Sequence, residues 1–232
     1  MRRKLPLLPI GAALAALLLG GLAIVARAPP QDLPWKPLTL DQPIGLATHW
    51  KIARLAGDPA RCRAVLAAGG VVFRPSGALS DRGACEVRNA GGLYGGLPQL
   101  LPAHPALTCG EALALAVWGR QSVRPQSREL LGSEVVAVDH YGAYACRDIR
   151  GAGQGRSQHA FANAIDIAGF RLADGRRVTV EAHYRDPGRR GAFLRGVRKD
   201  ACRVFSTALG PDFNAAHHDH LHLDMGGWGT CR

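Results

Sequence analysis

Capping signals and apolar spacing predict three helices. Asp58-Pro59 is an N-cap followed by proline at the first helical position, and Gly69-Gly70 would end that helix. Residues 108–111 (TCGE) match a capping box and open an Ala/Leu-rich helix that runs through Trp118. A third helix is predicted where apolar residues recur at helical spacing before a glycine: Phe193, Val197, Ala201, Val204, Ala208 and Gly210.

Shorter apolar runs predict strands at residues 134–138, 143–146, 164–172, 177–180 and 220–224. Asp174-Gly175 would join the third and fourth of these as a hairpin. Residues 140–142, with Asp139 beside them, are expected to form a turn. Few strands and several helices in mixed order predict an α+β fold with a small antiparallel β-sheet flanked by helices.

The first 28 residues predict a membrane segment. Arg2-Arg3-Lys4 precedes an uncharged run, residues 5–26, which as a helix would span ~33 Å. Positive charge at this flank predicts that the rest of the chain is exported. Residues 26–28 match a small-x-small cleavage site, but Pro29 would follow the cut, so a retained anchor is favoured over a cleaved signal. We therefore expect a domain in the periplasm, anchored to the inner membrane, or released if the signal is cleaved.

Three segments follow from this organisation. The anchor or signal covers residues 1–28, a proline-rich linker covers 29–43, and one domain covers 44–232. The net charge is +11, and four of the positive residues lie in the first segment, which leaves +7 for the exported part. That charge suits peptidoglycan or another anionic cell-wall polymer. The basic residues are scattered rather than arranged in a stripe with aromatic residues, so nucleic acid is not an expected partner.

All six cysteines lie beyond the first segment, and none forms a CxxC motif. An even number of dispersed cysteines in an exported chain indicates disulfides rather than a thiolate metal site. Of the fifteen possible connectivities, we predict that neighbours along the chain pair: Cys62–Cys85, Cys109–Cys146 and Cys202–Cys231.

Two clusters of polar residues carry candidate chemistry. Residues 157–166 (SQHAFANAID) contain His159 and Asp166, and residues 217–224 (HHDHLHLD) hold four of the nine histidines. On a strand, His220 and His222 would project to the same side. Two imidazoles and a carboxylate suit zinc, which in catalytic sites takes three protein ligands and leaves a position for water. The alternatives are a solvated HxH strand and an ordinary hydrogen-bonded His–Asp pair.

Other polar and aromatic residues have simpler expected roles. Ser157 is expected to cap a turn or support the following histidine rather than act as a nucleophile. Asp224 would support a ligand at the end of its strand. Trp118 is expected in the core, and packing is also favoured for Trp35 and Trp228 over stacking on sugar.

The pattern SxHxxxxAxD followed by a late HxH resembles the LAS superfamily of zinc peptidases, which includes lysostaphin-type, D-Ala-D-Ala peptidase-type and hedgehog-type domains. With the segments LPWKPLTL, CGEALALAVW, GAYACR and HHDHLHLDMG, the chain beyond residue 33 resembles the bacterial extensin-like C-terminal domain family. This resemblance implies a disulfide-braced, hedgehog- or D-Ala-D-Ala peptidase-like fold. It also implies Zn²⁺ ligands at His159, Asp166 and His222.

The same resemblance implies roles for further residues. His220 falls on the position that acts as general base or transition-state stabiliser in relatives with HxH. Arg147 corresponds to an arginine that contacts the scissile carbonyl, where a guanidinium can hold developing negative charge; Arg150 or Arg156 could fill this role instead. Ala162 stands where many relatives have glycine.

Two functions are consistent with these residues. The first is a zinc-dependent metallopeptidase that hydrolyses peptide bonds of peptidoglycan at the envelope, of D,D-carboxypeptidase or endopeptidase type. The second is a non-catalytic wall-binding or structural module that keeps the fold and the metal. The presence of His220 and Arg147 beyond the three ligands favours the enzyme, because a purely structural zinc usually has a fourth protein ligand.

Overall fold

The computed structural model describes residues 13, 15, 17, 20, 21, 25–80, 85–149, 155–227 and 229–232. Most of the predicted membrane segment, residues 1–28, lies outside the described residues. Within the described part of the chain, no helix is both long and apolar enough to cross a membrane.

A six-stranded sheet carries most of the polar residues of interest. Its strands run in the order β3-β5-β6-β9-β8, and β7 pairs with β6 off this path. They are β3 (Gln99–Leu101), β5 (Val135–His140), β6 (Ala164–Leu172), β7 (Arg177–Thr179), β8 (Thr207–Leu209) and β9 (Leu221–Asp224). The predicted hairpin is confirmed, and Gly175 adopts the left-handed φ of 86° that glycine tolerates best. All pairs are antiparallel except β3 with β5, so the predicted α+β class is confirmed but the larger sheet is mixed.

A second, three-stranded antiparallel sheet has the order β1-β2-β4. Its strands are β1 (Val72–Pro75), β2 (Ala90–Gly95) and β4 (Leu107–Thr108). Gly91 allows β1 and β2 to approach closely, because a Cβ there would lie 2.4 Å from the Arg74 carbonyl oxygen.

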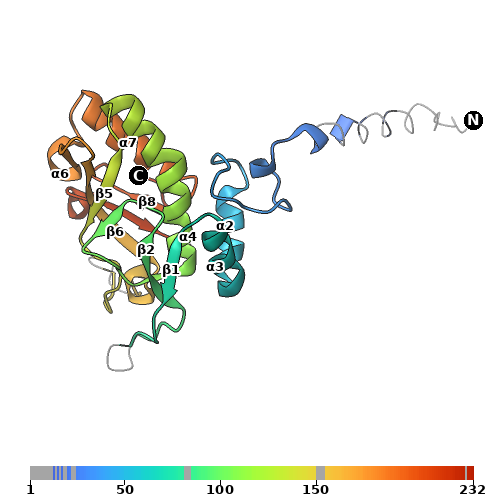
Figure 1. Ribbon diagram of the computed structural model, residues 1–232, viewed down its shortest axis with the longest axis horizontal. Coiled ribbons are helices and arrows are strands. Elements are labelled where there is room, and N and C mark those ends of the chain that lie inside the picture. Colours follow the sequence, from blue (N-terminus) through green and yellow to red (C-terminus); the bar gives the residue numbers. More distant parts are fainter. Residues whose placement is uncertain are drawn as a thin grey trace, which may run out of the picture.

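Helices cover the larger sheet and the N-terminal side of the domain (Figure 1). They are α2 (Thr48–Ala56), α3 (Pro59–Ala68), α4 (Cys109–Trp118), α6 (Val180–His183) and α7 (Arg189–Ala201), with short 3-10 turns η1 (Pro30–Asp32), η4 (Gln158–Phe161) and η5 (Ala215–His217). Helix α4 continues through π turns η2 (Gly119–Val123) and η3 (Ser127–Leu131), which flank α5 (Arg124–Gln126). Pro125 has no N–H to donate, and the wider turns on either side accommodate it.

The core lies between the larger sheet and helices α4 and α7. Trp118 is only 2% exposed, as expected of a core residue, and its indole N–H donates to the Val197 carbonyl at 2.8 Å. Its ring contacts Phe170 of β6, which in turn meets Phe193 of α7 edge-on. Both predicted N-caps are confirmed: Asp58 accepts from the Arg61 N–H, and Thr108 accepts from the N–H three residues on.

Three local predictions are wrong because long-range contacts decide them. The predicted third helix ends at Ala201 rather than near residue 208, since residues 207–209 pair with β9. Residues 143–146 form no strand, because their backbone groups bond to the η4 loop, as in Ala145 N–H to His159 O at 3.1 Å. Asp139 and His140 belong to β5 and not to a turn.

All six cysteines are paired, but only one predicted disulfide is correct. Cys202–Cys231 is confirmed. The other two are Cys62–Cys109 and Cys85–Cys146. Helix α3 packs on α4, so Cys62 meets a partner 47 residues away and not its neighbour in sequence.

The proline-rich segment 29–43 packs onto the domain. Leu33, Leu38 and Leu40 are buried. The Leu40 carbonyl accepts from Gln121 at 2.6 Å. Trp35, expected to pack inside, is instead 61% exposed, and Trp228 lies outside the described residues.

Candidate metal centre

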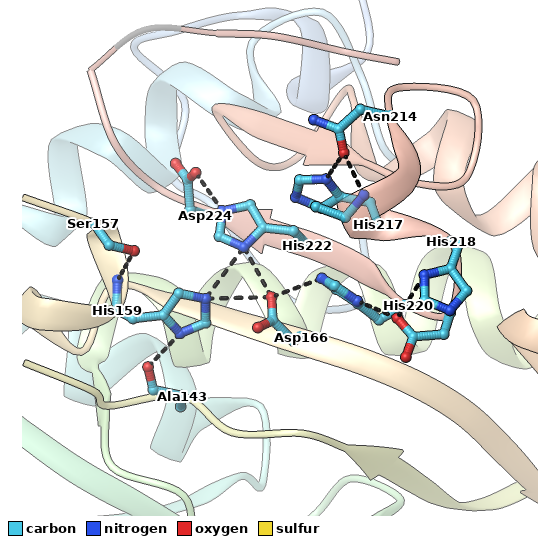
Figure 2. Close-up of polar contacts among 12 residues, drawn as sticks. Ala143, Ser157, His159, Asp166, Asn214, His217, His218, His220, His222 and Asp224 are labelled. Carbon is cyan, nitrogen blue, oxygen red and sulfur yellow. Dashed lines mark hydrogen bonds and ion pairs between the residues drawn. The ribbon is translucent and has the colours of Figure 1, made fainter. Parts of the chain in front are cut away.

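Three side chains from separate elements converge on one point of the larger sheet. His159 Nε2 lies 3.2 Å from Asp166 Oδ1 and 3.2 Å from His222 Nδ1. His222 Nδ1 lies 2.9 Å from the same Asp166 oxygen. Figure 2 shows the three side chains pointing toward one another. The three residues predicted as metal ligands are therefore brought together, and this group could hold a metal ion.

Strand register and one short turn account for this convergence. Asp166 and His222 are directly opposite each other in the antiparallel β6–β9 pair. His159 lies on η4, five residues before β6, and this turn is capped by Ser157, whose Oγ accepts from the His159 N–H. The expected capping role of Ser157 is thus confirmed.

In His159 and His222, the outer ring nitrogen, which points away from Asp166, faces a hydrogen-bond acceptor. His159 Nδ1 lies 2.7 Å from the Ala143 carbonyl, and His222 Nε2 lies 3.0 Å from Asp224 Oδ2. When a metal is bound, each of these outer nitrogens can keep the ring proton, which leaves the inner nitrogen free to offer its lone pair to the ion. The two inner nitrogens and the Asp166 carboxylate would then be three ligand atoms around one point. Asp224 hydrogen-bonds to His222, the contact that its expected supporting role requires.

The spacing of these atoms fits a small divalent ion. Ligand atoms ~2.0–2.1 Å from a tetrahedral zinc are about 3.3–3.4 Å apart. The three separations here, between 2.9 and 3.2 Å, are only slightly shorter. Two imidazoles with one carboxylate form a ligand set that zinc accepts readily.

Without a metal, a proton takes the place of the cation. Burial opposes protonation of His222, but hydrogen bonds to Asp166 and Asp224 outweigh it and raise its pKa to about 9. Burial also opposes ionisation of Asp166, but hydrogen bonds from His159 and His222 hold its pKa well below the usual range. Asp166 is therefore a carboxylate at any physiological pH, as a metal ligand must be.

A fourth imidazole, that of His220, approaches the same carboxylate. Its Nε2 lies 3.6 Å from Asp166 Oδ1, and its Nδ1 lies 2.8 Å from Asp219 Oδ1. Figure 2 shows His220 reaching Asp166 from the side opposite to His159. In a neutral His220 whose Nδ1–H donates to Asp219, the lone pair of Nε2 faces the cluster. Sequence reasoning missed Asp219, although its place directly before His220 was a usable signal.

Most of the chain matches a known protein family. Residues 60–232 match the family described as "Extensin-like protein C-terminus". The chain belongs to this extensin-like family. No curated protein and no solved structure matches it.

Ala162 of this extensin-like domain has an unusual backbone. Its φ is 52°, the left-handed region that favours glycine, and its side chain is fully buried. Glycine adopts this backbone conformation more readily than alanine does. Neighbouring contacts hold the turn in place: the Thr108 N–H donates to the Ala162 carbonyl at 2.7 Å, and Thr108 Oγ1 donates to Asn163.

Arg147 is connected to the segment that carries His159 only by a backbone hydrogen bond. Its carbonyl accepts from the Ser157 N–H at 3.2 Å, and its guanidinium makes no hydrogen bond or ion pair with any residue that the structure describes. Of the two alternatives, Arg156 pairs with Asp148 at 3.1 Å, and Arg150 lies outside the described residues. The role of Arg147 stays a prediction.

Two further titratable residues, His217 and Glu111, interact with residues of the cluster. The His217 ring centroid lies 5.1 Å from that of His220, and burial, followed by the charges of His220 and His222, lowers the pKa of His217 to about 4. Glu111, expected to complete a capping box, is fully buried, and its carboxyl oxygens hydrogen-bond to no described residue. Burial and then the charge of Asp224 raise the pKa of this carboxyl well above its usual range, which favours its neutral form.

Proposed function

We propose that this extensin-like domain is a zinc-dependent hydrolase of peptide bonds in the cell wall. The observation that carries the proposal is the convergence of His159, Asp166 and His222, with hydrogen-bond acceptors at the outward nitrogens of both histidines. A zinc ion held there supplies Lewis-acid chemistry, polarising a carbonyl and activating water near neutral pH. Three protein ligands leave a fourth position for that water, as in catalytic zinc sites.

The proposed proton acceptor is His220. Its Nε2 faces the cluster with a lone pair, and the hydrogen bond to Asp219 fixes the tautomer and ring orientation. A carboxylate behind a histidine also stabilises the imidazolium that forms when the ring takes a proton. His220 can then return this proton to the leaving amine. The arrangement of His220 and Asp219 is what distinguishes this site from a purely structural zinc site.

Arg147 is proposed to bind substrate beside the metal, against a carbonyl oxygen or a terminal carboxylate. Support comes from the resemblance to D-Ala-D-Ala peptidase-type domains and from the backbone bond to Ser157, two residues before the ligand His159. A guanidinium suits either group, because it can donate two parallel hydrogen bonds.

The proposed substrate is the peptide part of peptidoglycan, and the proposed location is the periplasmic side of the inner membrane. Three disulfides suit an oxidising compartment. The +7 net charge of the exported part suits an anionic polymer. The uncharged run at residues 5–26 would keep the domain near the membrane.

The test combines metal analysis of the full chain with digestion of isolated peptidoglycan by the wild type, His220→Ala and His218→Ala. His218 is the matched control, because its side chain is largely exposed and lies outside the cluster. We expect one zinc per chain in all three, with peptide fragments from the wild type and His218→Ala only. Zinc without fragments from any of them would favour a wall-binding module. Fragments that persist in His220→Ala would remove His220 from the mechanism.

A further inference from the structure

A patch of exposed apolar side chains lies on the N-terminal side of the domain. Trp35 is 61% exposed, Leu46 87% and Trp50 47%. They border one shallow groove of about 550 Å³, which is also lined by Asp32, Pro34, Ala47 and Arg54. Single exposed apolar residues are ordinary, but a contiguous group that includes two tryptophans marks an interaction surface.

Hydrogen bonds hold the patch in a fixed shape. The Leu46 N–H donates to Asp32 Oδ1 at 2.7 Å, and the Lys51 ammonium donates to the Pro30 carbonyl at 2.6 Å. Gly45 permits this closeness, because a Cβ there would lie 2.4 Å from Asp32 Oδ1. Segment 29–35 is thus bound to the start of α2, and exposure of Trp35 is not the result of a loose chain end.

The position of the patch points to a bilayer. Trp35 is seven residues beyond residue 28, so the two are separated by at most ~25 Å of extended chain. Figure 1 shows the N-terminal part of the chain leaving the domain beside α2, the helix that carries Trp50. If residues 5–26 are the proposed anchor, the patch lies within reach of the headgroup layer where that anchor ends.

The charges around the groove favour an anionic lipid surface. Arg54, which lines the groove, and Lys36, next to Trp35 in the chain, are both exposed. The Arg54 guanidinium lies 5.4 Å from the Trp50 ring. The one carboxylate of the groove, Asp32, already accepts a backbone hydrogen bond. Tryptophan beside basic residues is typical of membrane–water interfaces.

We propose that Trp35, Leu46 and Trp50 insert into the headgroup region of an anionic bilayer and hold the domain against the membrane in one orientation. This inference rests on the anchor in the proposed function, but not on zinc or hydrolysis. The apolar rings and Leu46 enter the interface, while Arg54 and Lys36 meet phosphate groups.

The experiment reconstitutes the full chain into phosphatidylcholine–phosphatidylglycerol vesicles with brominated acyl chains, which quench nearby tryptophan emission. Trp35→Phe, Trp50→Phe and the double variant assign the signal, with Trp118 and Trp228 retained throughout. Leu46→Ser tests the third residue, and Val136→Ser is its matched control, being exposed on β5 outside the patch. Zinc content is measured on every sample.

We expect quenching in the wild type and in Val136→Ser, a weaker effect in Leu46→Ser, and loss of about half or more of the quenchable emission in the double variant. Three results would overturn the proposal: chains that float with the vesicles without quenching, equal quenching in the double variant, or no flotation. Binding of soluble glycan strands to the tryptophans in place of vesicles would also overturn it. Quenching in chains that lack zinc or hydrolysis would separate this inference from the failure of the enzyme proposal.

Discussion

Asp166 and His222 face each other across the β6–β9 pair, with His222 Nδ1 2.9 Å from Asp166 Oδ1. Side chains alternate between the two faces of a sheet, so a slip of one residue in this register would move His222 to the opposite face. The register of two strands therefore provides two of the three candidate ligands. The third, His159, depends on the η4 turn and on the Ala143 carbonyl.

The support that Asp224 gives to His222 predicts a measurable loss of zinc affinity. Asp224 accepts from both His222 Nε2 and the Gly226 N–H, and asparagine cannot accept both bonds with carboxylate strength. Asp224→Asn should weaken zinc binding about 10- to 100-fold in a competition with a chelating dye. Asp174→Asn, on the exposed hairpin turn, is the control. Equal affinities in the two variants would show that Asp224 does not orient the ligand.

Stability of the metal-free protein should fall as the pH rises from about 6.5 to 9. The raised pKa of His222, about 9 when folded, stabilises the fold fully below the unfolded pKa of about 6.5, and this stabilisation is lost as the pH rises through the folded pKa. The free energy of unfolding should decrease by at most about 3 kcal/mol over this range. The stabilisation that comes from the depressed pKa of Asp166 is complete above about pH 4, so it stays constant between pH 6.5 and 9. Urea unfolding in a chelator measures the effect, and His222→Gln should flatten it; a steep pH dependence in that variant would refute the assignment.

Zinc should reverse this pH dependence. The ion binds the deprotonated ring, so binding releases the His222 proton, and affinity should rise by up to about tenfold per pH unit between pH 6.5 and 9. Titration in two buffers of different ionisation enthalpy counts the released protons. No proton release at pH 7.5 would mean that zinc does not bind His222.

Asp219 is predicted to act as a positioning residue for His220. His220→Ala should lower kcat for peptide hydrolysis by about 10²–10⁴. Asp219→Asn should lower kcat less and shift the acidic limb of the pH profile, because the carboxylate no longer stabilises a protonated His220. Zinc content should not change in either variant. Loss of zinc in Asp219→Asn would instead indicate a purely structural role.

The Cys85–Cys146 disulfide should stabilise the site as well as the fold. It closes a sequence separation of 61 residues, for which chain entropy predicts about 4 kcal/mol. Cys146 also lies three residues from Ala143, whose carbonyl orients His159. The double variant Cys85→Ser/Cys146→Ser should therefore lose stability in urea unfolding and bind zinc more weakly. Peptide mapping that links Cys62 to Cys85 would contradict the pairing on which this rests.

Local signals in the sequence predicted what local interactions decide. The caps at Asp58 and Thr108 and the hairpin at Gly175 involve residues a few positions apart. The histidine and aspartate clusters were visible because zinc ligands need unusual residue types. The extensin-like family membership was visible in the same segments.

Long-range contacts decide what the sequence could not show. Cys62 pairs with Cys109 because α3 packs on α4, and no spacing rule contains that contact. The orientation of His159 depends on a backbone carbonyl, that of Ala143, which has no sequence signature. The capping pattern predicted the hydrogen bond from the Glu111 N–H to Thr108. It did not predict that tertiary packing buries the Glu111 side chain.

X-ray absorption at the zinc edge of the purified full chain would show whether His159, Asp166 and His222 hold one zinc ion. We expect one zinc per chain, with imidazole nitrogen and carboxylate oxygen ligands at about 2.0–2.2 Å, and loss of this signal in His222→Gln. Zinc that is absent from the wild type, or that keeps the same ligand environment in His222→Gln, would contradict it.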